Sequence, residues 1–219
     1  MIELFFDFIS PYAYLAWTQA RALGERTGRT IEPRPVLFAA ILNALGTRGP
    51  AEVPARRSYV MKDVLRAAHR AGVPIAPPPA HPFNPLPALR LVAAPLDPTL
   101  RWRAIDALFA ATWGGGDGID GPEQIARVLT AAGLDAAPLL AGAGSPEAKA
   151  RLRQNTDEAL ARGAFGVPSL FVGDELFFGF HSFPDLEAHL RGDDPVAGHA
   201  ALLERWATLP ATATRKTPG

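Results

Sequence analysis

The sequence contains no cysteine among its 219 residues. This absence excludes disulfide bonds, thiolate metal sites and any redox chemistry carried by a pair of protein thiols. A protein-disulfide oxidoreductase is therefore excluded, whatever the fold. Thiol chemistry in which a bound small molecule supplies the sulfur is not excluded.

A net charge is also absent, because 22 Lys and Arg residues balance 22 Asp and Glu residues. We therefore expect neither nucleic acid nor an anionic membrane as a partner. No apolar run reaches the roughly 18 residues that a membrane span needs. No basic segment precedes the first apolar residues, as a signal peptide requires. These features predict a cytoplasmic globular protein, and a hydrophobic content of 48% suffices for a substantial core.

The N-terminal run carries the clearest signal for function. The aromatic-rich residues Ile2 to Phe8 predict a buried strand, and Ser10 and Pro11 then fit the N-cap and the first position of a helix. A hydroxyl beside the free N–H groups of a helix N-terminus is placed to stabilise an anion. The alternative is that Ser10 only caps the helix.

A second strand over Ile31 to Leu37 would complete a strand–helix–strand unit with parallel strands. The next 126 residues, 38–163, are poor in strand signals and rich in helical ones. The loop from Pro74 to Pro87 contains seven prolines, and rigid loops of this kind often line sites. The predicted helices of this stretch are Phe38 to Leu45, Ser58 to Ala71, Pro87 to Ala94, Thr99 to Trp113, Gly121 to Ala132 and Ser145 to Gly163.

Strand signals return near the end of the chain. Ser169 to Val172 and Leu176 to Phe178 flank the turn Gly173-Asp174 and predict a hairpin, followed by a helix from Pro184 to Leu190. This order predicts an α/β, thioredoxin-like fold (βαβ…ββα) with an inserted all-helical domain. The predicted domains are 1–37 with 164–192 (thioredoxin-like), 38–163 (helical insertion) and 193–219 (a C-terminal helix and a tail disordered from Pro210).

Val167-Pro168 stands directly before the predicted third strand. X–Pro bonds are the only common cis peptide bonds. In a thioredoxin-like fold this position faces the N-terminus of the first helix. A cis bond would turn the Val167 N–H and C=O into the site, where they can pair with an extended peptide. The alternative is an ordinary trans proline that begins a strand.

These motifs together resemble one known family. The run Phe5-Phe-Asp-Phe-Ile-Ser-Pro-Tyr-Ala-Tyr-Leu15 is similar to the signature of 2-hydroxychromene-2-carboxylate isomerases, which are relatives of kappa-class glutathione transferases and DsbA-like oxidoreductases. Further matches follow in family order. They are Pro35-Val-Leu-Phe-Ala-Ala-Ile41, Ala51-Glu-Val-Pro-Ala-Arg-Arg-Ser-Tyr59, Pro82-Phe-Asn84, Gly133-Leu-Asp135 and Gly163-Ala-Phe-Gly-Val-Pro-Ser169.

The resemblance implies glutathione as cofactor. Ser10 would occupy the place of the catalytic cysteine of the redox relatives and donate a hydrogen bond to the glutathione sulfur, which favours the thiolate. Val167 and Pro168 would bind the cysteinyl backbone. Arg56 falls where the family carries a basic residue for a peptide carboxylate; the alternative is a solvated arginine.

The family interconverts 2-hydroxychromene-2-carboxylate and trans-o-hydroxybenzylidenepyruvate, and it regenerates the thiol. For the small aromatic substrate we expect Tyr12, Phe83, Asn84 and Trp113 to line a mainly apolar pocket. The alternatives are that Tyr12 packs in the first turn, that Trp113 belongs to the core and that Asn84 shapes a turn. The resemblance also implies a homodimer.

One segment departs from the family pattern. The family usually reads Phe-Trp-Gly-x-Asp-Arg-Leu after the last strand, and the acid binds the glutathione ammonium group. Here His181 replaces the acid and Ser182 the arginine. An imidazole does not match a carboxylate as partner of an ammonium group, although Ser182 still offers a hydroxyl to a carboxylate. Thr47 and Gly49 also differ from the usual residues.

Three functions therefore stay open: a glutathione-dependent isomerase of aromatic catabolism, a kappa-like glutathione transferase, and a non-catalytic binding protein on the same scaffold. The first regenerates the thiol, the second consumes it, and the third would be insensitive to Ser10→Ala. The remaining histidines (His69, His81, His189 and His199) lack metal-ligand spacing, and we expect them to be structural or surface residues.

Overall fold

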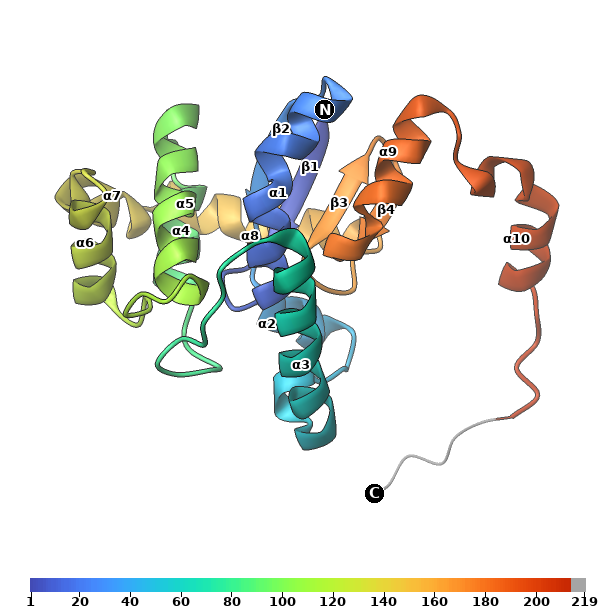
Figure 1. Ribbon diagram of the computed structural model, residues 1–219, viewed down its shortest axis with the longest axis horizontal. Helices are drawn as coiled ribbons and strands as arrows, with labels where there is room; N and C mark the ends of the chain where they lie inside the picture. The colour runs from blue at the N-terminus through green and yellow to red at the C-terminus, as the bar shows by residue number, and fades with distance from the viewer. Residues whose placement is uncertain (214–219) are drawn as a thin grey trace. The chain divides into compact units, whose positions relative to one another are not determined.

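The structure is a computed structural model that describes residues 1–213 (Figure 1). The chain divides into two compact units, one from Met1 to Phe183 and one from Pro184 onward. The three domains expected from the sequence stay a prediction.

The first unit is built on a four-stranded sheet with the order β2-β1-β3-β4 (Figure 1). β1 runs parallel to β2 and antiparallel to β3, and β3 and β4 form the predicted hairpin. This is the predicted thioredoxin-like arrangement. The strands are β1 (Ile2–Phe6), β2 (Ile31–Pro35), β3 (Ser169–Val172) and β4 (Glu175–Phe178).

Helix α1 (Pro11–Thr27) crosses over from β1 to β2 and ends at Gly28, whose φ of 62° suits a residue without a Cβ. Seven helices then separate β2 from β3 within the described residues, and Figure 1 shows α4 to α7 as a group beside the sheet. They are α2 (Phe38–Ala44), α3 (Pro54–Ala71), α4 (Leu86–Ala93), α5 (Pro98–Trp113), α6 (Pro122–Ala131), α7 (Ala136–Ala143) and α8 (Pro146–Ala161).

Two features of this helical segment differ from the expectation. Helix α3 begins at Pro54 rather than at Ser58, because Pro54 occupies the first helical turn after the extended Val53. Helix α7 was not predicted. Its sequence, AAPLLAGA, is almost uniformly apolar and contains Pro138 and Gly142, so it lacks a helical period.

The core beside α1 is an aromatic cluster. The Phe6 ring lies 5.4 Å from Phe8, 5.8 Å from Trp17 and 5.5 Å from Phe109. Trp17 is 4% exposed, and its indole N–H donates to Asp106 Oδ1 at 2.7 Å. The cluster anchors the strand that leads into Ser10 and the helix that follows it, so the position of Ser10 is fixed from both sides.

The second unit contains most of α9 (Phe183–Arg191), a 3₁₀ turn (Pro195–Gly198) and α10 (Ala200–Ala207). Residues 210–213 form no helix or strand, and the rest of the tail predicted to be disordered lies outside the described residues.

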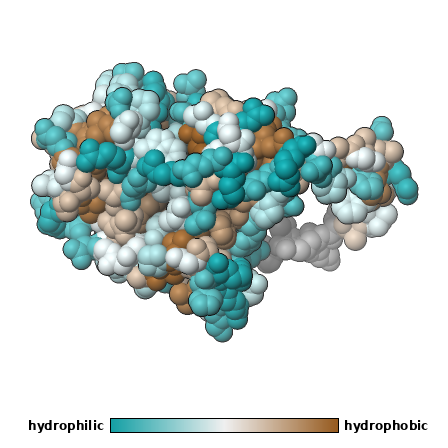
Figure 2. Space-filling view, turned by 45° about the horizontal axis from the view of Figure 1, so that its top comes forward, coloured by the Kyte–Doolittle hydropathy of each residue, from teal (hydrophilic) through white to brown (hydrophobic). Residues whose placement is uncertain are grey.

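Hydrophobic residues on the face drawn in Figure 2 occur in several patches between hydrophilic ones. Over residues 1–213, the search for a helix long and apolar enough to cross a membrane finds none.

Candidate active site

Ser10 sits at the N-cap of α1, as the sequence predicts. Its φ of −95° and ψ of 118° are extended, and its Oγ accepts a hydrogen bond from the Ala13 N–H at 3.2 Å. The Ser10 side chain also donates to the Val167 carbonyl oxygen at 3.2 Å, across 157 residues of sequence. The capping and the functional interpretations of Ser10 are therefore compatible, because one hydroxyl both accepts from the helix and donates across the site.

The Val167-Pro168 bond is cis, which was the condition for the functional interpretation of this dipeptide. The Pro168 carbonyl accepts a hydrogen bond from the Gly179 N–H at 2.9 Å. Val167 is 6% exposed, and its N–H donates no hydrogen bond to the residues that the structure describes. Buried backbone donors are almost always paired, and this N–H is available to an acceptor that the chain itself does not supply.

The first turn of α1 offers another donor. Pro11 has no N–H and the N–H of Ala13 is used by Ser10, whereas the N–H of Tyr12 has no acceptor among residues 1–213. Orphan N–H groups of this kind, together with the helix dipole, favour an anion beside Ser10.

Tyr12, Asp63 and His181 form a second cluster next to Ser10. The Tyr12 hydroxyl donates to Asp63 Oδ2 at 2.6 Å, and His181 Nε2 lies 3.7 Å from the same oxygen. The Tyr12 and His181 rings meet edge to face at 5.7 Å. Burial, and then the hydrogen bond to Asp63, raises the pKa of Tyr12, so its hydroxyl stays protonated.

Asp63 was not among the residues singled out from the sequence. Its contacts are 51 residues away at Tyr12 and far beyond that at His181, so no local pattern marks it. The one signal in the sequence is indirect, because the loss of the family acid at position 181 leaves a place for another carboxylate.

Asp7 precedes Ser10 by three residues in the chain and is fully buried. Its carboxyl oxygens accept from the N–H groups of Ile9 at 3.0 Å and Phe38 at 2.9 Å, and its backbone carbonyl accepts from the Ser10 N–H at 3.1 Å. Burial raises the pKa of Asp7 to about 7, against the opposing effect of the two N–H donors. Asp7 thus ties the turn before Ser10 to the start of α2.

The proline-rich loop reaches the same region through His81. His81 Nε2 lies 3.0 Å from the Ile9 carbonyl oxygen, and because a carbonyl only accepts, this nitrogen carries the proton. The ring lies 5.4 Å from Trp113 and 6.4 Å from Phe83. Burial lowers the pKa of His81. No local pattern separates His81 from the other histidines, since its contact with Ile9 spans 72 residues.

The other predicted site residues are less closely associated with Ser10. Trp113 is 2% exposed and donates its indole N–H to the Phe8 carbonyl at 2.8 Å, and exposed Asn84 accepts from the Leu86 N–H at 3.1 Å. These contacts favour the structural alternatives for both. Phe83 is half-buried, and Arg56 is exposed on α3. The Ser182 hydroxyl donates to the Gly179 carbonyl at 2.8 Å.

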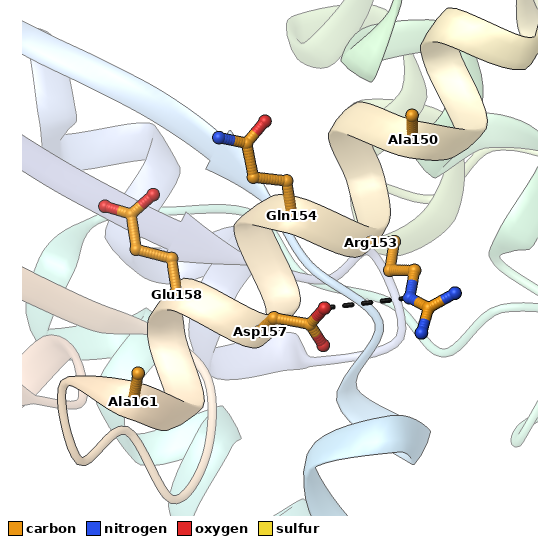
Figure 3. A pocket seen from close by; sticks show the side chains of 6 residues that line it. All are labelled: Ala150, Arg153, Gln154, Asp157, Glu158 and Ala161. Atoms are coloured by element: carbon orange, nitrogen blue, oxygen red, sulfur yellow. Dashed lines mark ion pairs between the residues drawn. The ribbon is translucent and has the colours of Figure 1, made fainter.

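A separate shallow depression of about 560 Å³ lies on the surface of α8 (Figure 3). Its charged lining includes Arg153 and Asp157, which form an exposed ion pair at 3.7 Å. It contains none of the residues predicted for the site and no buried polar group, so we assign it no function.

Comparison with known proteins agrees with the thioredoxin-like fold. The DsbA-like thioredoxin domain family matches residues 1–191. A 2-hydroxychromene-2-carboxylate isomerase of Sphingobium xenophagum is 31% identical over 191 residues, covering 86% of this chain and 97% of that protein. A glutathione S-transferase kappa 1 of Caenorhabditis elegans is 29% identical over 202 residues, covering 84% and 89% of the two chains.

A solved structure of a 2-hydroxychromene-2-carboxylate isomerase superposes with a TM-score of 0.74 at 24% identity, covering 96% of this chain and 99% of that one. The fold is therefore shared along nearly the whole length. On these matches, the chain belongs to the DsbA-like thioredoxin domain family and, within it, to the 2-hydroxychromene-2-carboxylate isomerase family.

Proposed function

We propose that this protein is a glutathione-dependent isomerase that interconverts 2-hydroxychromene-2-carboxylate and trans-o-hydroxybenzylidenepyruvate-type compounds in aromatic catabolism. The observation that carries the proposal is the Ser10 hydroxyl, which lies at the N-cap of α1 and 3.2 Å from the Val167 carbonyl, in a chain without cysteine. The hydroxyl replaces a protein thiol at this position, so it serves to activate a thiol that comes from a ligand.

The residues present fit glutathione. The unpaired N–H of Val167 and its carbonyl are complementary to the cysteinyl backbone of a peptide, and the Ser10 hydroxyl and the Tyr12 N–H are complementary to a thiolate. Arg56 provides a guanidinium for a terminal carboxylate. When bound, glutathione supplies a thiolate nucleophile that adds reversibly to a conjugated double bond and so permits rotation about it.

Ser10 has one proton to donate, and in the structure it goes to the Val167 carbonyl. Thiol activation requires the hydroxyl to turn this proton from the carbonyl to the sulfur. The exchange is favourable because a hydrogen bond to an anion is stronger than one to a neutral carbonyl. The Ala13 N–H stays bound to Oγ throughout, so the oxygen keeps its position while its proton moves.

The substrate side is formed by the proline-rich loop. Phe83 offers an apolar ring for a flat aromatic substrate, and His81 lies between Phe83 and the backbone of Ile9. Neutral His81 keeps an unprotonated Nδ1 that accepts a hydrogen bond from a substrate hydroxyl. The homodimer and the cytoplasmic location implied by the family stay part of this proposal.

The relatives named kappa-class transferases favour a second candidate, the conjugation of glutathione to electrophiles. One assay separates the two candidates. In this assay, 2-hydroxychromene-2-carboxylate is incubated with the protein and with glutathione at a concentration far below that of the substrate. Free thiol is measured throughout. We expect complete equilibration with no loss of thiol. Conversion that stops when glutathione is exhausted would assign the transferase, and no conversion at any glutathione concentration would contradict the proposed reaction.

A further inference from the structure

The cluster of Tyr12, Asp63 and His181 occupies the position from which the family acid is missing. His181 stands where relatives carry the carboxylate, yet its imidazole Nε2 lies 3.7 Å from Asp63 Oδ2. Asp63 comes from α3, a different part of the chain, and its side chain is 20% exposed. A carboxylate is therefore present at this place, on another element.

Two short connections link this cluster to the Ser10 centre. Tyr12 follows Ser10 by two residues in the first turn of α1. His181 follows Gly179 by two residues, and the Gly179 N–H donates to the Pro168 carbonyl at 2.9 Å. Two residues span at most about 7 Å. Asp63 is thus connected to the Ser10 centre from two sides, through the Tyr12 hydroxyl and through His181.

The surroundings of Asp63 favour a cation as its additional partner. Tyr12 donates one hydrogen bond to Oδ2 and orients the carboxylate, but the phenol carries no charge to neutralise it. Arginine, which relatives carry at position 182, is replaced by Ser182, whose hydroxyl is bound to the Gly179 carbonyl. The ion-pair partner of Asp63 among the described residues is His181, and at 3.7 Å its Nε2 is too far for a hydrogen bond, so the carboxylate still gains from a charged hydrogen-bond donor.

The residue expected to bind the carboxylate end of the peptide lies on the same helix as Asp63. Arg56 and Asp63 are seven residues apart on α3, which places them on one face and about 10 Å apart along the helix axis. An extended tripeptide spans a similar distance. The face therefore offers a cation to the terminal carboxylate and an anion to the terminal ammonium group.

We propose that Asp63 binds the ammonium group of the γ-glutamyl residue, in place of the missing acid at position 181, and thereby makes the site selective for a thiol peptide with a free amino end. The inference rests on the proposed use of glutathione and adds the residue that recognises its amino group. Tyr12 acts as a positioning residue for the carboxylate rather than as a wall of the substrate pocket.

The test is a comparison of two ligands on three proteins by titration calorimetry. The ligands are reduced glutathione and glutaryl-cysteinyl-glycine, in which hydrogen replaces the ammonium group. The proteins are the wild type, Asp63→Asn and Asp157→Asn. Asp157 is a matched control because it is an exposed carboxylate on α8, in the depression of Figure 3.

We expect the wild type and Asp157→Asn to bind glutathione about tenfold more tightly than the deaminated peptide, which is the effect of one charged hydrogen bond. In Asp63→Asn the two peptides should bind equally, with the affinity for the deaminated peptide unchanged, which also shows that the variant is folded. Retention of the tenfold preference in Asp63→Asn would overturn the inference and leave the proposed function standing. Failure of both peptides to bind the wild type would overturn the proposed function itself.

Discussion

Ser10 has two roles that a single substitution removes together, capping α1 and donating to an anion. The chain provides a control for this. Ser145 caps α8 in the same way, followed by Pro146, and accepts from the Ala148 N–H at 3.1 Å. Ser145→Ala therefore reproduces the loss of the cap at a site remote from the chemistry.

We expect Ser145→Ala to lower the free energy of unfolding by about 1 kcal/mol, the usual contribution of an N-cap, and Ser10→Ala to lower it by more, because it also removes the hydrogen bond to the buried Val167 carbonyl. Only Ser10→Ala should lower the isomerisation rate, by about tenfold or more, because it alone removes a charge-assisted hydrogen bond. Urea denaturation and a spectrophotometric rate assay measure the two effects. Equal isomerisation rates in the two variants would show that Ser10 acts only as an N-cap.

Asp7 gives stability a pH dependence of its own. Its pKa is raised from 3.8 to about 7 in the folded protein, so the folded state binds the proton more tightly than the unfolded state. The contribution to stability is complete below about pH 4 and is lost as the pH rises toward 7. A shift of this size corresponds to roughly 4 kcal/mol as an upper bound.

The free energy of unfolding of the wild type relative to Asp7→Asn should therefore fall between pH 4 and pH 7 and stay constant above. The asparagine does not titrate, so the difference isolates Asp7 from other groups. Denaturation series at several pH values measure it. A difference that does not vary with pH over this range would show that Asp7 keeps its ordinary pKa.

Elements with clear end signals were predictable from the sequence. The Ser-Pro pairs begin α1 and α8, and Gly72 ends α3 with a φ of 65°. Helix α7 was not predicted because its exposed positions are apolar too, so the sequence hides the buried face at Leu139 and Ala143. For the short segment after β4 the sequence offers only the family pattern, and the 3₁₀ turn of this segment (Phe180–Ser182) places His181 beside Asp63.

Gly179 sets the direction of this segment, and its φ of 82° and ψ of 158° lie in a region almost restricted to glycine. We expect Gly179→Ala to cost about 1–3 kcal/mol of stability and to weaken glutathione binding, since the bond from its N–H to the Pro168 carbonyl would shift. Gly28→Ala, at the C-terminal end of α1 with φ 62°, should cost about 1 kcal/mol and leave binding unchanged. Denaturation and calorimetry test the pair, and unaltered binding by a folded Gly179→Ala would contradict the role assigned to the segment.

At the scale of the whole molecule, the sequence specified the topology better than the site. The order of strands and helices brings Ser10 and Val167 together in any thioredoxin-like fold, so their contact across 157 residues was predictable. The positions of Asp63 and His81 depend on how α3 and the proline-rich loop pack within the helical segment, and no local periodicity encodes that. The sequence leaves a site role and a structural role open for both Trp113 and Asn84. Only the burial of Trp113 and the hydrogen bonds of both residues favour the structural role.

The proposed mechanism depends on one electrostatic effect, the stabilisation by Ser10 and the N-terminus of α1 of a thiolate supplied by glutathione. The most direct measurement is a pH titration of the ultraviolet thiolate absorption of glutathione bound to the wild type and to Ser10→Ala. We predict that the bound thiol has a pKa below its ordinary value of about 8.5, and that Ser10→Ala returns the pKa toward that value. A pKa of bound glutathione at or above the ordinary value, or one that Ser10→Ala leaves unchanged, would contradict the account.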